Sequence, residues 1–234
     1  MKLISCHRGK IQHIAKYGLM PTQTRPFSTG LRAIDWMLAG GAFPCGAIHE
    51  ILSQEGEGLP LFFAAILASS AGKQGAVVWC DRGGRLYPPA LEAAGIGLER
   101  LFLLRPSNAA DELWAVAECL RCRGVSVTVA TLGRLSRIDA RRLQLAAERG
   151  GGTGILLRPS GALSAEYAAA TRWLVRPIPG ERLVQRWQLQ LIHGHGGRVG
   201  QSAILEVSRE TDHVRALETV GDRSAQKEAI RKRA

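Results

Sequence analysis

One loop of this chain has the spacing, but not the side chains, of a loop that binds nucleotide phosphates. That chemistry needs the pattern GxxxxGK[ST], in which backbone N–H groups wrap the phosphates, a lysine neutralises them and a hydroxyl holds Mg²⁺. Here Ser53 stands at the first glycine, Leu59 at the lysine and Pro60 at the hydroxyl. Glu55 and Glu57 add negative charges that repel phosphate. We therefore predict a degenerate nucleotide site that binds no cofactor and no metal. Its residues are Ser53, Glu55, Gly56, Glu57, Gly58, Leu59 and Pro60.

The elements around this loop are predicted to be a buried strand and a buried helix. An apolar run at residues 47–52 precedes the loop, and an apolar stretch at residues 61–68 follows it. Pro60 suits the first turn of that helix, because its missing N–H has no partner there. Strand, loop and helix in this order form the scaffold of a phosphate-binding loop. The scaffold is therefore expected to be present although its chemistry is absent.

The same part of the chain resembles the opening of the RecA recombinase core. The shared features are the turn at residues 28–30 (Ser-Thr-Gly), Asp35, the glycine and proline spacing of residues 40–46, and the strand at residues 48–51 (Ile-His-Glu-Ile). Further stretches resemble one RecA-like family in particular, ImuA, an accessory family of error-prone translesion DNA synthesis. They are residues 79–81, 86–91, 94–96, 104–106, 141–148 and 154–159. The resemblance covers about residues 28–214.

This resemblance implies an α/β fold, with a RecA-like, mostly parallel sheet flanked by helices and a C-terminal antiparallel β-hairpin. Alternation of valine with small polar residues predicts a strand at residues 125–129. In RecA the matching strand ends in an aspartate that supports Mg²⁺, whereas here Ala130, Thr131 and Leu132 follow. Because this loss is independent of the loss of the loop lysine, we expect no ATP hydrolysis and no catalytic residue. The chain is predicted not to be an enzyme.

Composition divides the chain into three predicted parts. Residues 1–27 form a basic segment and linker, and residues 28–220 a RecA-like domain with the C-terminal β-hairpin. Residues 221–234 form a flexible basic tail. The first segment is either a short helix used for self-association, as in RecA-like proteins, or a solvated lead-in. From Thr171 the pattern is expected to be antiparallel, with the hairpin strands at residues 185–207.

The charge balance favours an anionic partner. Lys and Arg number 31 against 20 Asp and Glu, which gives a net charge of +11. Such a charge suits nucleic acid or an acidic protein face. The candidate partner or nucleic-acid contacts are Arg134, Arg137, Arg141, Arg223, Lys227, Arg231, Lys232 and Arg233. For the helix that carries Arg137 and Arg141, the alternative is a solvated face with Leu143, Leu145 and Ala146 packed inward. The connections at residues 132–135 and 158–164 are too short to favour RecA-style binding of single-stranded DNA.

The cysteines and histidines do not form a metal site by their spacing. Cys119 and Cys122 make one C-x-x-C, but no second pair follows, so reduced thiols are expected. His193 and His195 are assigned to a hairpin tip because no third ligand has a suitable spacing. No apolar run reaches ~18 residues, and the N-terminus has no signal-peptide core, so we expect a cytoplasmic protein.

The resemblance to ImuA implies a non-catalytic adaptor of SOS-induced mutagenesis. Its implied partners are an ImuB-type, polymerase-like scaffold and a DnaE-type error-prone polymerase, and the resemblance also allows a contact with RecA. The implied place of action is the nucleoid during DNA damage. A second hypothesis, a SulA-like inhibitor of the FtsZ division GTPase, accounts only for the middle of the chain. A third, a weak ATPase, would require Mg²⁺-dependent nucleotide binding.

Overall fold

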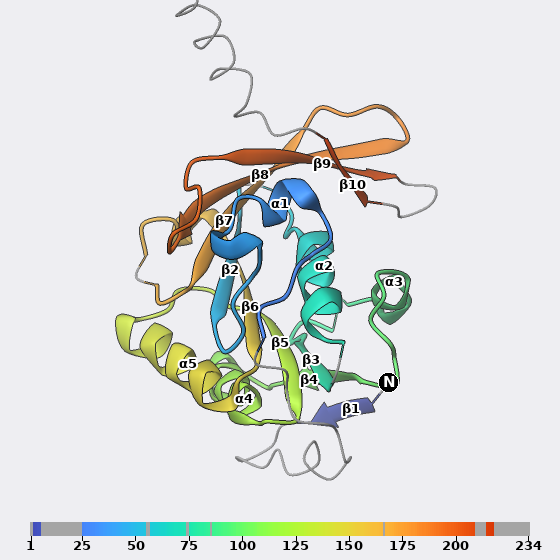
Figure 1. The fold of residues 1–234 in the computed structure, drawn as a ribbon. Coiled ribbons are helices and arrows are strands. Elements are labelled where there is room, and N and C mark those ends of the chain that lie inside the picture. Colours follow the sequence, from blue (N-terminus) through green and yellow to red (C-terminus); the bar gives the residue numbers. More distant parts are fainter. Residues whose placement is uncertain are drawn as a thin grey trace, which may run out of the picture.

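The computed structural model describes residues 2–5, 25–54, 57–73, 75–84, 86–165, 167–208 and 214–217. These residues form a ten-stranded sheet in the order β1-β4-β3-β5-β6-β2-β7-β8-β9-β10 (Figure 1). The strands are β1 (Lys2–Ser5), β2 (Ile48–Ser53), β3 (Ala76–Cys80), β4 (Leu101–Arg105), β5 (Val125–Thr131), β6 (Thr153–Arg158), β7 (Thr171–Ile178), β8 (Val184–Gly194), β9 (Ser202–Ser208) and β10 (Val214–Leu217). The α-helices are α1 (Arg32–Asp35), α2 (Leu61–Ala71), α3 (Pro88–Ala93), α4 (Ala109–Arg121) and α5 (Arg137–Gly150), with 3-10 turns η2 (Ala39–Gly41) and η3 (Ser160–Ala162).

The sheet has a parallel part and an antiparallel extension. Every neighbouring pair from β1 to β7 in the sheet order is parallel, and β8, β9 and β10 then add antiparallel. The predicted fold class and the β8–β9 hairpin are therefore confirmed. The prediction of antiparallel structure from Thr171 onward was wrong for β7, which runs parallel to β2 and antiparallel to β8. Two parallel strands must be joined by a crossover connection, and residues 159–170 connect β6 to β7 on the other side of β2.

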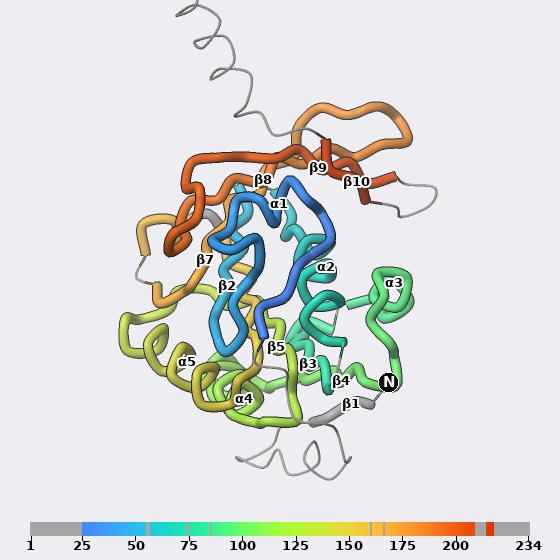
Figure 2. Tube along the Cα trace, in the orientation of Figure 1, coloured from blue at the N-terminus to red at the C-terminus, as the bar shows by residue number. Residues whose placement is uncertain are grey.

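Helices cover both faces of the parallel part. α2, with α1 and Leu91 of α3, packs against one face, whereas α4 and α5 pack against the other (Figure 1). The buried strands β2, β3 and β6 have no exposed residue, in agreement with the continuous apolar runs of β3 and β6. The antiparallel strands close over the α1 and α2 face, where Phe62 and Trp187 lie with ring centroids 5.1 Å apart. Figure 2 shows α1 in blue beside β10 in red, although they are far apart in sequence.

Local signals in the sequence fix where α4 and α5 begin and where α5 ends. The Asn108 Oδ1 atom accepts the Asp111 N–H at 2.9 Å, and the Ser136 Oγ atom accepts the Asp139 N–H at 3.1 Å. Both bonds satisfy an N–H of the first turn that has no partner within the helix. Gly151, with φ 78°, ends α5 in the left-handed conformation that glycine adopts without strain.

The first strand differs from the expectation for the N-terminal segment. Residues 2–5 form β1 and pair parallel with residues 102–105 of β4, so this part of the segment is a strand and not a helix. The physical reason is that an edge strand exposes a row of unpaired backbone N–H and C=O groups, which a short extended segment satisfies. Residues 6–24 and 218–234 lie outside the described part of the chain, so the boundaries after residues 27 and 220 stay predictions. Within the described ranges, no helix has the length and apolar composition that a membrane span needs.

Candidate functional site

The degenerate loop lies where the sequence places it, between the end of β2 and the start of α2. Ser53 is the buried last residue of β2, and α2 begins at Leu61. Pro60 is buried and precedes the helix without a side-chain cap, and Leu59 packs against the main hydrophobic core. The residue at the lysine position thus contributes to the core instead of facing a phosphate. Glu57 and Gly58 are exposed, whereas Glu55 and Gly56 lie outside the described residues.

The backbone of this loop uses N–H groups that a phosphate would need. The Leu61 N–H donates to the Leu59 carbonyl at 2.8 Å, and the Glu57 N–H donates to the Gln54 carbonyl at 3.1 Å. Pro60 has no N–H to offer. A phosphate-binding loop works because several free N–H groups converge on one anion. Among the described residues of this loop, two N–H groups are thus already bonded and Pro60 has none.

The end of β5, where a RecA-like ATPase has an aspartate, carries a threonine and a buried leucine. Thr131 ends the strand with an exposed side chain, and Leu132 is buried against the layer of α4 and α5. The Leu132 N–H donates to the Leu157 carbonyl at 3.0 Å. At the lysine position the structure thus places a partly buried leucine, and residues 130–132 at the end of β5 supply no carboxylate.

The turn and aspartate that resemble RecA have a structural role here. The Asp35 carboxylate accepts the Ser28 hydroxyl at 2.7 Å and the Thr29 hydroxyl at 2.9 Å. It also accepts the backbone N–H groups of Thr29 at 3.0 Å and Gly30 at 3.1 Å. Asp35 is 9% exposed, so these bonds replace water around most of its charge. The motif therefore holds the turn at residues 28–30 against Asp35 of α1.

Three buried charged side chains meet on β2, β6 and β7, a cluster that was not predicted from the sequence. Glu50 accepts Nη1 of Arg158 and Nε of Arg172, both at 2.8 Å, and all three side chains are at most 5% exposed. Arg158 also donates to the Gly133 carbonyl at 3.2 Å, and Arg172 to the Ala162 carbonyl at 2.7 Å. A buried charge is tolerated only when it is paired and hydrogen-bonded. The available signal was a Glu within an apolar strand and an Arg at the end of another.

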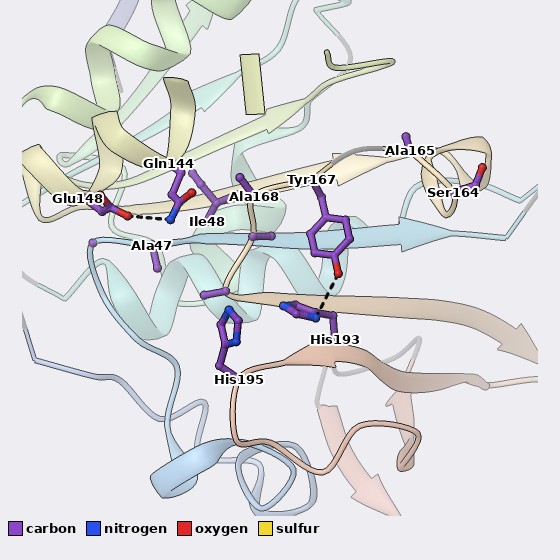
Figure 3. A pocket seen from close by; sticks show the side chains of 13 residues that line it. Ala47, Ile48, Gln144, Glu148, Ser164, Ala165, Tyr167, Ala168, His193 and His195 are labelled. Atoms are coloured by element: carbon purple, nitrogen blue, oxygen red, sulfur yellow. Dashed lines mark hydrogen bonds between the residues drawn. The ribbon is translucent and has the colours of Figure 1, made fainter. Parts of the chain in front are cut away.

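A cleft opens at the other end of β2, at the turn between β8 and β9. Its volume is about 600 Å³, and Gln144, Glu148, Tyr167, His193 and His195 supply its polar lining (Figure 3). The Tyr167 hydroxyl and His193 Nδ1 are 3.3 Å apart, and Gln144 donates to Glu148 at 2.8 Å. Burial lowers the pKa of His193, and the charges of His195 and Arg172 lower it further. Both histidines were predicted at the hairpin tip. His193 instead lies near the end of β8, whereas His195 lies in the turn.

Among the described residues, the cleft has no set of metal ligands. Across the described ranges, no three His, Cys, Asp or Glu side chains lie close enough together to hold a metal ion. The four cysteines in these ranges, Cys45, Cys80, Cys119 and Cys122, are free thiols. Burial raises the pKa of the Cys80 thiol strongly, and the neighbouring Glu112 carboxylate raises it further. Such a thiol stays protonated and is a poor nucleophile.

The structure extends the basic patch that was predicted on one helix. Arg137 and Arg141 of α5 lie in one groove with Arg121 of α4, whereas Arg134 is exposed on the preceding loop. The residues that line the groove are Arg121, Arg137, Ile138, Arg141, Arg142, Leu145, Ala146 and Arg149. The five predicted contacts beyond residue 220 lie outside the described part of the chain.

The alternative for this helix, a solvated face over three inward residues, is right in part. Leu143 and Ala146 are buried, as that alternative expected. Leu145 is only half-buried and lines the groove, and Ile138 beside it is 80% exposed. The basic helix therefore presents apolar surface together with its arginines.

Comparison with known proteins agrees with the resemblance seen in the sequence. No protein-family model matches the chain. The protein ImuA of Caulobacter vibrioides strain NA1000 / CB15N is 32% identical over 201 residues, which cover 76% of this chain and 82% of the relative. RecA of Mesomycoplasma hyopneumoniae strain 7448 is 28% identical over 109 residues, which cover 47% of this chain and 32% of that protein. The similarity to ImuA spans most of both chains, whereas the similarity to RecA is confined to part of each. With the RecA-like sheet and its altered phosphate loop, this similarity shows that the chain belongs to the ImuA family.

Proposed function

We propose that this protein is a non-catalytic adaptor of error-prone translesion DNA synthesis. The observation that carries the proposal is the packing of Leu59 at the position where a RecA-like ATPase has its phosphate-binding lysine, together with the lack of a carboxylate at residues 130–132, where such an ATPase supports Mg²⁺. A RecA-like fold that has lost both positions keeps its surfaces but not its nucleotide switch. In this proposal, those surfaces bind other proteins and hold them together in one complex.

The proposed partners are an ImuB-type scaffold and a DnaE-type error-prone polymerase. Support for this pathway comes from the similarity to ImuA, and support for an anionic or acidic contact comes from the net charge of +11. In this proposal DNA contact is secondary and runs through exposed arginines such as Arg134. Contact with RecA itself is part of the same proposal.

An affinity pull-down of the tagged full chain from DNA-damaged host cells tests the adaptor function. The extract is divided and treated with or without nuclease, and the recovered proteins are identified by mass spectrometry. Recovery of the scaffold or the polymerase after nuclease treatment is the expected result. Recovery that is lost with nuclease would show that DNA, not protein contact, holds the complex together. Recovery of FtsZ without either partner would replace the proposal with the division-inhibitor hypothesis.

A nucleotide titration tests the non-catalytic part separately. A fluorescent ATP analogue is added to the full chain with and without Mg²⁺, and fluorescence anisotropy reports binding. No Mg²⁺-dependent binding is expected, because the loop offers neither the lysine nor the hydroxyl. Saturable binding that needs Mg²⁺ would favour a weak ATPase.

A further inference from the structure

The groove between α4 and α5 combines strong positive charge with exposed apolar surface. Its volume is about 540 Å³, and it is named the α5 groove, with the eight lining residues given above. On α5, Ile138, Arg142, Leu145 and Arg149 follow one another at four, three and four residues, which places them along one face of the helix. Arg137 and Arg141 flank this face, and Arg121 of α4 faces it from the other side.

The arginines of the groove are largely free to bind an external acid. Arg121 pairs with Glu118 on its own helix, and Arg141 donates to the Gln144 side-chain oxygen at 2.8 Å. Among the residues that the structure describes, no carboxylate forms an ion pair with Arg137, Arg142 or Arg149. Guanidinium groups bind carboxylates through paired, directional hydrogen bonds.

We propose that the α5 groove binds an acidic, amphipathic helical segment of a partner protein. The inference rests on the adaptor function proposed above, and it names the surface and the chemistry of one contact. Glutamates or aspartates at three- and four-residue spacing pair with the arginines, while leucine-like side chains cover Ile138 and Leu145. α5 has 14 residues and is about 21 Å long, which matches a partner helix of three to four turns.

The apolar residues favour a peptide over a nucleic-acid backbone. Phosphate contacts would engage the arginines alone and leave Ile138, 80% exposed, without any favourable burial. An amphipathic peptide removes both Ile138 and Leu145 from water and neutralises the arginines at once. Because exposed ion pairs are screened by salt, the apolar contact also supplies affinity that persists at physiological ionic strength.

Charge argues against the terminal segments of this chain, and against a symmetric second copy, as the occupant. Residues 6–24 contain no Asp or Glu, and residues 218–234 carry more basic than acidic side chains. Neither segment complements five arginines. A second copy that used the same groove would place like charges opposite each other in a two-fold interface. The occupant is therefore a different, acidic protein.

Fluorescence anisotropy with the full-length protein and three labelled probes tests the inference. The probes are a designed acidic amphipathic peptide of about 16 residues, a scrambled peptide of the same composition, and a single-stranded oligothymidylate of about 20 nucleotides. The amphipathic peptide is expected to bind ~10-fold or more tightly than the scrambled one, because only its regular spacing matches the groove. Ile138→Ala and Arg142→Ala are each expected to weaken this binding by ~5–10-fold.

Two matched variants control for nonspecific effects. Val199→Ala truncates an aliphatic side chain that is 53% exposed, and Arg182→Ala removes an exposed arginine outside the groove. Both should retain binding within about twofold of wild type, since they leave the groove intact. Circular dichroism and thermal melting of every variant verify that the fold is kept, as expected for substitutions of exposed side chains.

Three results would overturn the inference. The first is equal binding of the amphipathic and scrambled peptides, and the second is no peptide binding at ~100 µM protein. The third is oligothymidylate binding that Arg142→Ala weakens and Ile138→Ala does not, which would assign the groove to nucleic acid. In the pull-down, unchanged recovery of partners by Ile138→Glu would reject the groove and leave the adaptor function standing. No recovery by wild type would reject the adaptor function itself.

Discussion

A buried histidine makes the stability of this fold depend on pH in a way that can be predicted. His49 is fully buried in β2, with Nε2 3.0 Å from the Pro44 carbonyl and Nδ1 2.9 Å from the Thr171 hydroxyl. The carbonyl can only accept, so Nε2 carries the proton, and the Thr171 hydroxyl donates to Nδ1. The same hydroxyl accepts the indole N–H of Trp173 at 3.0 Å. The network is therefore satisfied by the neutral imidazole, and a second proton on Nδ1 would leave the Thr171 O–H without its acceptor and place a positive charge in the buried site.

The magnitude follows from the pKa of this imidazole. Burial lowers the pKa of His49 from 6.5 to about 4, against a smaller opposing effect of the Pro44 carbonyl. The unfolded chain therefore binds a proton near pH 6.5, whereas the folded protein does so only near pH 4. His49 thus contributes its full stability above pH 6.5 and loses that contribution as the pH falls towards 4. At about 1.4 kcal/mol per pH unit, the loss amounts to the order of 3 kcal/mol.

Urea unfolding of the full chain between pH 5.0 and 8.0 measures this effect against His49→Gln, which does not titrate. Wild type should lose about 1.4 kcal/mol of unfolding free energy per pH unit more than the variant does below pH ~6. At pH 8 the variant should be less stable by about 1–3 kcal/mol, because glutamine cannot satisfy both partners as well. The difference should shrink as the pH falls. Thr171→Ser keeps the hydroxyl and His49, so its slope should match wild type. Parallel profiles for wild type and His49→Gln would refute the reasoning.

Four further substitutions probe the other interactions that the structure brings together. Glu50→Gln should lower the free energy of unfolding by about 3–5 kcal/mol, because it leaves the charges of Arg158 and Arg172 buried without a carboxylate; a loss below ~1 kcal/mol in urea unfolding would contradict this account. Asp35→Ala should lower the free energy of unfolding by about 2–4 kcal/mol and lower the thermal midpoint, because four donors lose their acceptor. Ser28→Ala removes only one of these donors, so it should lower the free energy of unfolding by about 1 kcal/mol. Leu59→Lys should lower stability by about 1–3 kcal/mol and should not create Mg²⁺-dependent ATP binding, since Pro60 still supplies neither a hydroxyl nor an N–H. An anisotropy titration that showed saturable binding would mean that the lysine was the missing element.

The features that depend only on residues close together in the chain could be predicted from the sequence. The caps at Asn108 and Ser136, the loop between β2 and α2, and the apolar strands could be predicted, because each depends on residues within a few positions. The absence of the loop lysine and hydroxyl is visible in the sequence for the same reason, since a phosphate loop is a contiguous motif. The mostly parallel sheet followed from the resemblance to RecA and ImuA.

Strand order and register determine the contacts between distant residues that could not be predicted from the sequence. Glu50 meets Arg158 and Arg172 across 108 and 122 positions, and His49 meets Thr171 across 122. These contacts exist because β2 lies between β6 and β7, and hydrophobic periodicity carries no information about which strands become neighbours. The basic face of α5 was visible in the sequence, but its pairing with Arg121 of α4 was not. Sequence therefore determined the elements and the missing chemistry, whereas only the tertiary structure determined which distant charges share a buried site and which share a groove.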